Sequence, residues 1–437
     1  MKCVLNADND RFQWRLYIFF AFVCFAVYWP VLGNDFLYGW DDHWMVINDM
    51  TLSGWTWDNL KRVFFEAHQN QYAPITELNF LFIYSLFKLN PLWFHLASLL
   101  WHIGCVILAY RFIQRILQMN GETLESDCRL LAFVSAFLFA IHPMNVEPVA
   151  WLSAVKVPIY VFFYLAGLLF YLRYIQKQKT SDYVWVVVCF ICSCMGKEQA
   201  VSFPICLILI DWFTCRNLKS FNLWVEKLMF FCIAIFFGVI AIIAQTSVSE
   251  GTFPFKNERL FLVCYAFFEY ITKGILPFHL NYLYPYPLES GAVLPLRFYV
   301  YPLLVAGLGV YLYTLRKNRI AMFGMGMFLV NLLFSLNIID MYRATIVADR
   351  YFYLSGLGLF LFGAHMLLPL VRKWKGWKRY VFVSVCTLYI LYLGGYTVTY
   401  SMRWKNMDTI QQYMKESIQE KENIDSSQKN AEANNSN

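Results

Sequence analysis

The sequence predicts an all-α protein that crosses a membrane about eleven times. Of its 437 residues, 59% are hydrophobic and only 15% are charged, whereas soluble domains carry about a quarter charged residues. Apolar segments recur from Trp14 to Thr399, and each is about 20 residues long, enough to cross a hydrocarbon core of about 30 Å. The net charge of +7 is carried largely by short basic loops. Such loops set membrane topology, so the charge does not indicate a nucleic-acid partner.

The first apolar segment, residues 14–32, is predicted to be a retained membrane helix. Arg11 and Arg15 lie at its start, as in a signal peptide, but it is longer than the usual apolar core of one. No pattern of small residues that would mark a cleavage site follows it. We therefore count it as the first span.

Basic and acidic segments predict the orientation of the chain. Residues 33–90 hold an excess of acids and are expected outside, with the amino terminus in the cytoplasm. Lysine and arginine cluster in four loops that are expected inside, at residues 173–179, 216–227, 316–319 and 372–379.

One apolar stretch, residues 260–278, breaks the alternation if it spans. Every basic loop falls on the cytoplasmic side only if this stretch lies along the outer interface or re-enters, and Glu269, Lys273 and Pro277 favour that interpretation. Eleven spans then remain, and the carboxyl terminus lies outside. We expect a multi-pass protein of the plasma (inner) membrane with its active site on the extracytoplasmic face.

The predicted organisation is one transmembrane domain, residues 1–400, followed by an extracytoplasmic tail, residues 401–437. The first outer loop, residues 33–90, is too long for a simple connection and is expected to carry interfacial helices at residues 57–67 and 75–86. The second outer loop covers residues 248–296. The tail starts with apolar residues at helical spacing, which predicts an interfacial helix, and it ends in a polar stretch that we expect to be disordered.

The cysteines and histidines do not form a recognisable metal motif. Twelve cysteines are scattered, mostly within apolar segments, where they are typical packing residues. We therefore predict neither disulfides nor structural zinc. His95 and His102 lie seven residues apart and are interpreted as packing or hydrogen-bonding residues rather than as ligands.

Two adjacent acids, Asp41 and Asp42, stand out at the start of the first outer loop, between aromatic residues. A carboxylate pair beside a bilayer is costly unless it meets water, a metal or a substrate. It could also be a helix cap or a pair of solvated loop acids.

Three later loops place further ionisable residues at the same predicted depth. They are His142 and Glu147, Lys197 and Glu198, and Asp349, Arg350 and Tyr351. Simpler roles exist for several: an ion pair of Glu147 with Lys156, a turn ion pair between Lys197 and Glu198, and a membrane anchor for Arg350. A lysine between two apolar helices is expensive, however, which favours a function for Lys197.

These motifs, taken together, resemble a known family. In chain order they are residues 40–42 (WDD), 72–76 (YAPIT), 89–95 (LNPLWFH), 142–143 (HP) with Glu147, 197–199 (KEQ), and 349–351 (DRY) followed by 354–358 (LSGLG). The ordered set resembles GT-C superfamily glycosyltransferases, and above all the membrane half of the transmembrane and tetratricopeptide-repeat-containing O-mannosyltransferases.

The resemblance implies a multispan fold with an extended first outer loop, a polyprenyl-phosphate sugar as donor, and an acceptor reached from the extracytoplasmic side. About forty residues follow the last predicted span, too few for two 34-residue tetratricopeptide repeats. The sugar therefore stays open, and so does the acceptor hydroxyl, which could belong to a protein, a lipid or a glycan.

The residues support a mechanism of this kind. Asp41 or Asp42 would act as the base, since close apposition raises the pKa of one of them, and the resemblance favours a direct, inverting displacement. Arg350 and Lys197 would bind the donor phosphate, with His142 as a weaker donor. The residues expected to bind or orient the acceptor are Glu147, Glu198, Tyr351 and Tyr72.

Three alternatives to this interpretation stay open at this stage. Paired aspartates can hold Mg²⁺ or Mn²⁺ through oxygen, but the phosphate already has candidate cationic partners, so we expect no required metal or other cofactor. A transporter or flippase for lipid-linked sugars would place its ionisable groups near the bilayer midplane and often has repeated halves, and neither is found. A non-catalytic membrane scaffold would not need the aspartates.

Overall fold

The computed structural model describes residues 7–68, 71–121, 123–246, 258–286, 294–336, 338 and 345–416. This part of the chain is helical and contains no β-strand beyond two isolated bridges, which confirms the predicted all-α class. The helices of the bundle are α1 (Ala7–Tyr28), α6 (Pro91–Met119), α7 (Glu125–Ile141), α9 (Lys156–Lys177), α10 (Thr180–Gly196), α11 (Phe203–Phe213), α12 (Phe221–Thr246), α13 (Arg259–Ile275), α14 (Val300–Thr314), α15 (Arg319–Leu333), α16 (Phe352–Lys373) and α17 (Trp377–Arg403).

The predicted count of eleven spans is not confirmed. Seven helical segments within the described residues are long and apolar enough to cross a membrane, and an eighth qualifies if α7 and the following turn, bent by 58°, form one broken span. Helices α10 and α15 lie at predicted spans but hold only 17 and 15 residues. At 1.5 Å per residue, helices of that length fall short of a core about 30 Å thick.

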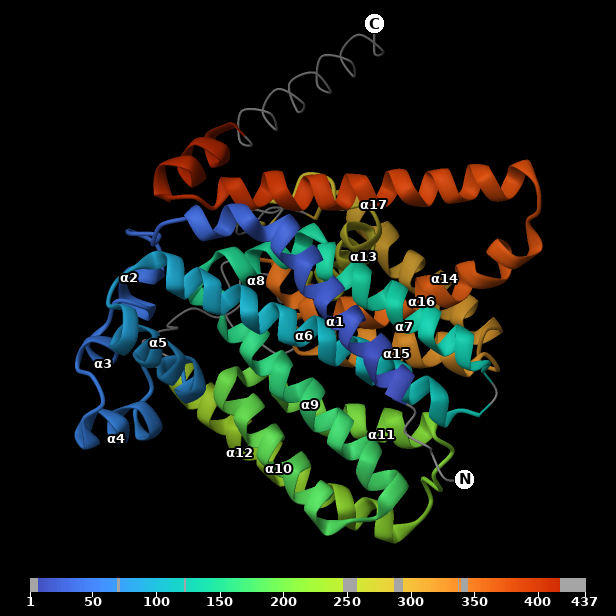
Figure 1. Ribbon diagram of the computed structural model, residues 1–437, viewed down its shortest axis with the longest axis horizontal. Coiled ribbons are helices and arrows are strands. Elements are labelled where there is room, and N and C mark those ends of the chain that lie inside the picture. The colour runs from blue at the N-terminus through green and yellow to red at the C-terminus, as the bar shows by residue number, and fades with distance from the viewer. Residues whose placement is uncertain are drawn as a thin grey trace, which may run out of the picture.

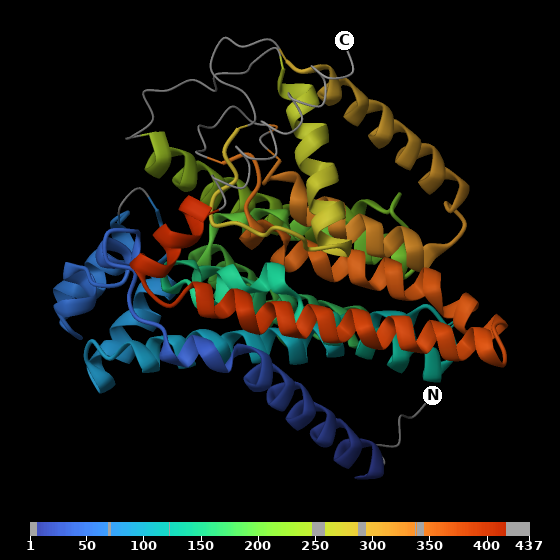
Figure 2. The ribbon, with the colours of Figure 1, turned by 90° about the horizontal axis from the view of Figure 1, so that it is seen from above.

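Helix α13 follows a different direction from its neighbours. It does not qualify as a span, and Figure 2 shows it running across α16 and α17 rather than beside them. This is the direction of a helix that lies along an interface, and its depth in the membrane stays a prediction. Residues 247–257 and 287–293 of the predicted second outer loop lie outside the described part of the chain.

The described residues of the predicted first outer loop form four short helices at one end of the bundle, with the start of α1 and the α16–α17 connection at the opposite end (Figure 1). They are α2 (Asp42–Met45), α3 (Asp49–Leu52), α4 (Trp57–Phe65) and α5 (Pro74–Phe87). Two of them match the predicted helices at 57–67 and 75–86. Thr56 caps α4 by accepting the Asn59 N–H at 3.2 Å, and Pro74 opens α5, where its missing N–H costs nothing.

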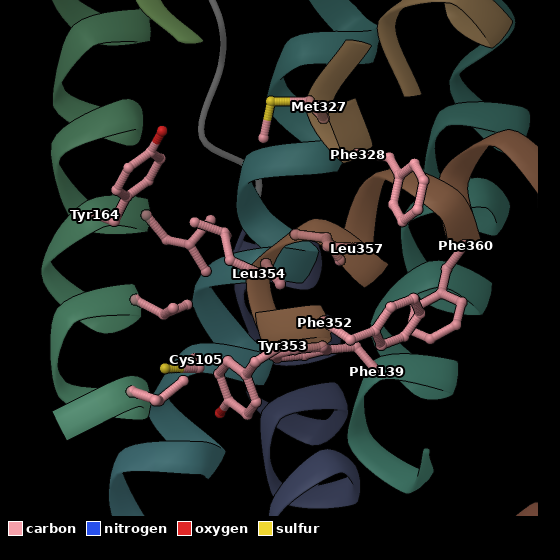
Figure 3. Packing of buried hydrophobic residues seen from close by; sticks show 14 of the residues in the cluster. Cys105, Phe139, Tyr164, Met327, Phe328, Phe352, Tyr353, Leu354, Leu357 and Phe360 are labelled. Carbon is pink, nitrogen blue, oxygen red and sulfur yellow. The ribbon is translucent and has the colours of Figure 1, made fainter. Parts of the chain in front are cut away.

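A single apolar core joins the helices that carry the later loops. Figure 3 shows side chains of α6, α7, α9, α15 and α16 meeting around Tyr353 and Phe352. His102 of α6 shares a hydrogen bond of 2.7 Å with the Tyr353 hydroxyl, which fits the predicted hydrogen-bonding role. Helices α15 and α16 are in close contact at Gly324 and Gly358, where a Cβ added to Gly324 would lie 2.9 Å from the Gly358 carbonyl oxygen and one added to Gly358 would lie closer still to that of Gly324. Small residues at a crossing permit such contact between membrane helices.

The tail begins with the predicted helix, over residues 407–416. Asn406 and Thr409 cap it reciprocally: the Thr409 N–H donates to Asn406 Oδ1 at 3.0 Å, and the Asn406 N–H to Thr409 Oγ1 at 3.1 Å. Ile410 is buried, and the Tyr413 hydroxyl donates to the Leu280 carbonyl at 2.9 Å. The polar stretch predicted to be disordered, residues 423–437, lies outside the described part of the chain, which ends at residue 416.

Candidate functional site

Asp42 fastens the first outer loop to the turn before α9. Its carboxylate is fully buried; Oδ1 accepts the Ser153 N–H at 2.9 Å and the Ser153 hydroxyl at 2.6 Å, and Oδ2 accepts the Leu37 N–H at 3.0 Å. Ser153 lies in the 3₁₀ turn η3 (Leu152–Ala154). Burial raises the pKa of Asp42 to about 6, although these hydrogen bonds act in the opposite direction. Both oxygens of Asp42 are therefore engaged in holding the loop.

Asp41 has the opposite character. It is only partly buried, and no hydrogen bond or ion pair joins its carboxylate to the described residues. Burial raises the pKa of Asp41 above its ordinary value, while the positive charges of Lys156 and Arg350 partly offset that effect. Of the two acids, Asp41 is the one with oxygens available to a substrate.

Lys156 interacts electrostatically with charged residues from the first loop and from two later turns. Its side chain is buried at the start of α9, and its ammonium donates to Oε1 of Gln71 in the first outer loop. The charges of Lys197, Glu198, Arg350 and Asp41 all act on this ammonium. The acid of the first loop and the basic residues of the later turns therefore act electrostatically on one ammonium group.

Arg350 and the buried Glu147 form a partly buried ion pair, and the Arg350 charge acts on Asp41. A terminal guanidinium nitrogen of Arg350 contacts Glu147 Oε1, and the Arg350 backbone N–H donates to Glu147 Oε2 at 2.8 Å. Glu147 lies in the short helix α8 (Val146–Ala150), and Arg350 in the 3₁₀ turn η6 (Asp349–Tyr351). Glu147 therefore pairs with Arg350, and not with Lys156, the partner that the sequence offered as an alternative.

Lys197 reaches the cluster from the end of α10. It is buried at 5% exposure, and its ammonium lies 3.5 Å from Glu198 Oε1. Glu198 opens the 3₁₀ turn η4 (Glu198–Ser202), and about 40% of its side chain is exposed. The Lys197–Glu198 ion pair, which the sequence offered as an alternative role, is present. The charges of both residues also act on the Lys156 ammonium.

Aromatic rings form one wall of the site. The Arg350 guanidinium carbon lies 5.5 Å from the Trp151 ring centre and 5.2 Å from that of Tyr351, distances typical of cation–π contacts. Trp40 meets Trp151 edge to face at 6.1 Å. The Trp151 indole N–H is buried and has no acceptor among the described residues. A buried donor without a partner is costly and is a natural contact for a bound oxygen atom.

Asp349 anchors the turn η6, which carries Arg350, through hydrogen bonds to two tyrosines. It is fully buried and accepts the Tyr284 hydroxyl at 2.9 Å and the Tyr400 hydroxyl at 3.5 Å. These bonds link the turn that carries Arg350 to residues 282–286 and to α17. Burial raises the pKa of the Tyr284 phenol well above its ordinary value, so Tyr284 stays a donor.

Two predicted site residues lie apart from the charged group. His142 is fully buried between the rings of Phe352 and Phe360, at 5.5 and 5.1 Å, and its Nδ1 accepts the Met144 N–H. That packing leaves the ring no path to a phosphate. The Tyr72 hydroxyl donates to the Phe64 carbonyl at 2.9 Å within the first loop, and its ring lies 6.2 Å from that of Phe237 in α12. Neither residue enters the proposal below.

The site does not fit a divalent cation held by both aspartates. Asp42 already accepts three hydrogen bonds, and the positive charges of Lys156 and Arg350 act on Asp41. The described residues contain no group of three or more metal-ligating side chains. Independence from metal stays a prediction.

The sequence reasoning missed three residues of the site: Lys156, Ser153 and Gln71. Lys156 appeared only as a partner for Glu147. The cost of a lysine at the start of an apolar helix, which drew attention to Lys197, applies equally to Lys156 and could have identified it. Nothing local in the sequence marks Ser153 or Gln71, because their partners lie 111 and 85 residues away.

Comparison with known proteins confirms the resemblance to O-mannosyltransferases over part of the chain. No family model matches it. It is 25% identical over 206 residues to protein O-mannosyl-transferase F38B6.6 of Caenorhabditis elegans, covering 44% of this chain and 27% of the relative. It is 24% identical over 176 residues to Tmtc3 of Drosophila melanogaster, covering 36% and 19%. It is 26% identical over 209 residues to TMTC2 of Mus musculus, covering 44% and 23%. The matched region therefore spans between about a fifth and a quarter of these relatives.

Proposed function

We propose that this protein transfers a sugar from a polyprenyl-phosphate donor to an acceptor hydroxyl on the extracytoplasmic face of a membrane. The observation that carries the proposal is the convergence of one available carboxylate, Asp41, with three cations, Lys156, Lys197 and Arg350. A base beside a cluster of positive charge is what a transfer from a phosphate leaving group needs. The relatives named as O-mannosyltransferases support the same chemistry.

Asp41 is the proposed base, and Asp42 is the residue that positions it. In an inverting displacement, Asp41 takes the proton of the acceptor hydroxyl as its oxygen attacks the anomeric carbon, and the bond from that carbon to the phosphate oxygen breaks. The partial burial of Asp41 favours proton acceptance, since it raises the pKa of the carboxyl group. Asp42 holds the start of α2 through Ser153 and Leu37, so Asp41 faces the later loops.

The donor phosphate is proposed to lie between Lys156, Lys197 and Arg350. Arg350 is fixed by Glu147 and supplies a planar fork that matches phosphate oxygens. Lys156 and Lys197 are buried, so their charges are screened less by water than those of surface lysines. The Trp151 ring and its unpaired N–H would face the sugar. Glu198 and Tyr351 are retained as residues that orient the acceptor.

The sugar is proposed to be mannose and the acceptor a protein hydroxyl, following the names of the relatives. The test uses purified full-length chain with polyprenyl-phosphate mannose, glucose and N-acetylglucosamine, each radiolabelled, and a serine- and threonine-containing peptide. We expect transfer from the mannose donor. Failure to cleave any donor would overturn the enzyme proposal, and movement of intact donor across a liposome membrane would favour a flippase instead.

Lys156→Gln is expected to weaken donor binding. The substitution keeps a polar side chain near Gln71 but removes a buried charge from the phosphate site, so the KM for donor should rise at least tenfold, the size of a charged hydrogen bond. The matched control is Lys61→Gln, an exposed lysine of α4 whose contacts are Asp58 and the Trp57 ring. Equal KM values for the two variants would remove Lys156 from the site.

Ser153→Ala is expected to shift the pH dependence of transfer. The Ser153 hydroxyl stabilises ionised Asp42, so its loss raises the pKa of Asp42 above about 6. When Asp42 takes up a proton, one of its acceptor oxygens becomes a donor and the loop that carries Asp41 loosens. Activity should therefore fall at a higher pH in the variant than in the wild type as pH is lowered. Profiles of kcat/KM that superimpose would contradict this coupling.

A further inference from the structure

A cavity with polar side chains in its lining lies at the end of the bundle away from the candidate site. It has a volume of about 750 Å³ and is lined by residues from the end of α9, the start of α10, and the α11–α12 connection with the first turns of α12. Helix α10 begins at the cavity with Thr180 and ends next to Lys197 of the candidate site. Its 17 residues span about 25 Å, so the two sites are separate.

The inner wall of this cavity is fixed by a buried ion network. Lys227 is fully buried and lies 2.9 Å from Asp211 Oδ2 and 2.6 Å from Glu226 Oε1. Arg216 contacts Asp211 at 2.9 Å and Glu226 at 2.8 Å, and the Tyr171 hydroxyl donates to Asp211 at 2.5 Å. The negative charges of Asp211 and Glu226 balance the positive charges of Arg216 and Lys227. The wall is therefore preorganised without a net charge of its own.

Exposed lysines are sequence neighbours of residues that line the cavity, on either side of Gln178 and next to Ser220. Lys177 and Lys179 lie at the end of α9 and just beyond it, and Lys219 lies in the α11–α12 connection; all three are exposed. None of them forms an ion pair with a described residue. Basic residues grouped at the end of membrane helices attract anionic headgroups.

Polar side chains and the apolar Leu223 and Val225 line the cavity, and further apolar side chains are exposed on the helices that leave it. Thr180, Asn217, Ser220 and Asn222 bring hydroxyl and amide groups to the cavity. Large apolar side chains are exposed on the two helices that leave the cavity, namely Val184, Trp185 and Val188 of α10 and Phe221, Trp224, Val225 and Leu228 of α12. A soluble ligand would use only the polar part, whereas a lipid would use both.

We infer that this cavity binds the headgroup of an anionic glycerophospholipid whose phosphate carries a polyol, such as inositol or glycerol. The phosphate would lie at Lys177, Lys179 and Lys219, and the polyol hydroxyls would meet the amide and hydroxyl side chains. The acyl chains would follow the apolar surfaces of α10 and α12. This site does not depend on the proposed glycosyl transfer, and its test needs no enzyme activity.

The test measures binding of dioctanoyl phosphatidylinositol to the purified full-length chain in detergent by native mass spectrometry. The variant Lys177→Gln/Lys179→Gln/Lys219→Gln is expected to bind about tenfold more weakly or worse, since each lysine near a headgroup contributes to attraction. The matched control, Lys373→Gln/Lys375→Gln/Lys378→Gln, removes the same charge from the exposed α16–α17 connection and should keep wild-type affinity. Asn222→Trp, which fills the cavity but keeps the charges, should also weaken binding.

Three results would overturn the inference. Equal losses in the two triple variants would mean that general surface charge attracts the lipid. Equal binding of dioctanoyl phosphatidylcholine would mean that the cavity does not select an anionic polyol headgroup. Displacement of the lipid by inositol 1-phosphate at the same concentration would mean that the ligand is soluble and that the acyl chains add nothing.

Discussion

Asp41→Asn is expected to lower the rate of sugar transfer by about 10²–10⁴-fold, the usual contribution of a general base. Asparagine keeps the size of the side chain and cannot accept the acceptor's proton. Because the Asp41 carboxylate has no hydrogen-bond partner among the described residues, the fold and donor binding should persist. Initial rates and thermal unfolding, measured on the same preparation, test both expectations. Asp58→Asn is the control, since Asp58 is an exposed acid of the same loop.

Asp42→Asn separates the base from its positioning neighbour. The amide replaces one acceptor oxygen with a donor, which then faces the Leu37 N–H or the two Ser153 donors. A buried unsatisfied group costs about 1–3 kcal/mol. Loss of activity in this variant should therefore accompany loss of stability, unlike in Asp41→Asn. Normal turnover by Asp41→Asn, with Asp42→Asn inactive but fully stable, would reverse the assignment of the two acids.

Glu147→Ala is expected to destabilise the protein by about 3 kcal/mol, because it leaves the Arg350 charge buried without its partner. Unfolding in a chemical denaturant, followed by tryptophan fluorescence, gives the measurement. The control is Glu125→Ala, which breaks an exposed pair with Arg129 and should cost less than about 1 kcal/mol.

A double variant of Glu147 and Arg350 tests whether this ion pair contributes to stability or to sugar transfer. Replacing both Glu147 and Arg350 by leucine removes the unpaired charge, so most of the lost stability should return. Sugar transfer should stay absent, because the phosphate site has lost its guanidinium. Recovery of activity together with stability would show that Arg350 does not bind the donor.

Much of the fold followed from the sequence because membrane helices are encoded locally. The described residues are helical, and the two interfacial helices of the first loop occur within two residues of their predicted bounds. The count of eleven spans is not confirmed, because some apolar helices are shorter than a membrane crossing requires. Helices such as α10 and α15 are apolar but too short to cross alone, and only their packing against α9 and α16 shows that they belong to the bundle.

The site was predicted in outline, but its pairings were not. Placing four loops on one face of the membrane was enough to bring Asp41, Lys197 and Arg350 together. Which acid is tied and which is available depends on Ser153, 111 residues from Asp42. The choice of Arg350 as the partner of Glu147 likewise depends on a contact across 203 residues. Such contacts are set by tertiary packing and leave no periodic signal in the chain.

The most direct test of the account is the position of a bound donor in a cryo-electron microscopy map of the wild-type protein with a non-hydrolysable polyprenyl-phosphonate sugar. We predict phosphonate density between Lys156, Lys197 and Arg350, with the anomeric carbon facing Asp41. Density for the phosphonate on the far side of the Glu147–Arg350 pair, out of reach of Asp41, would contradict it.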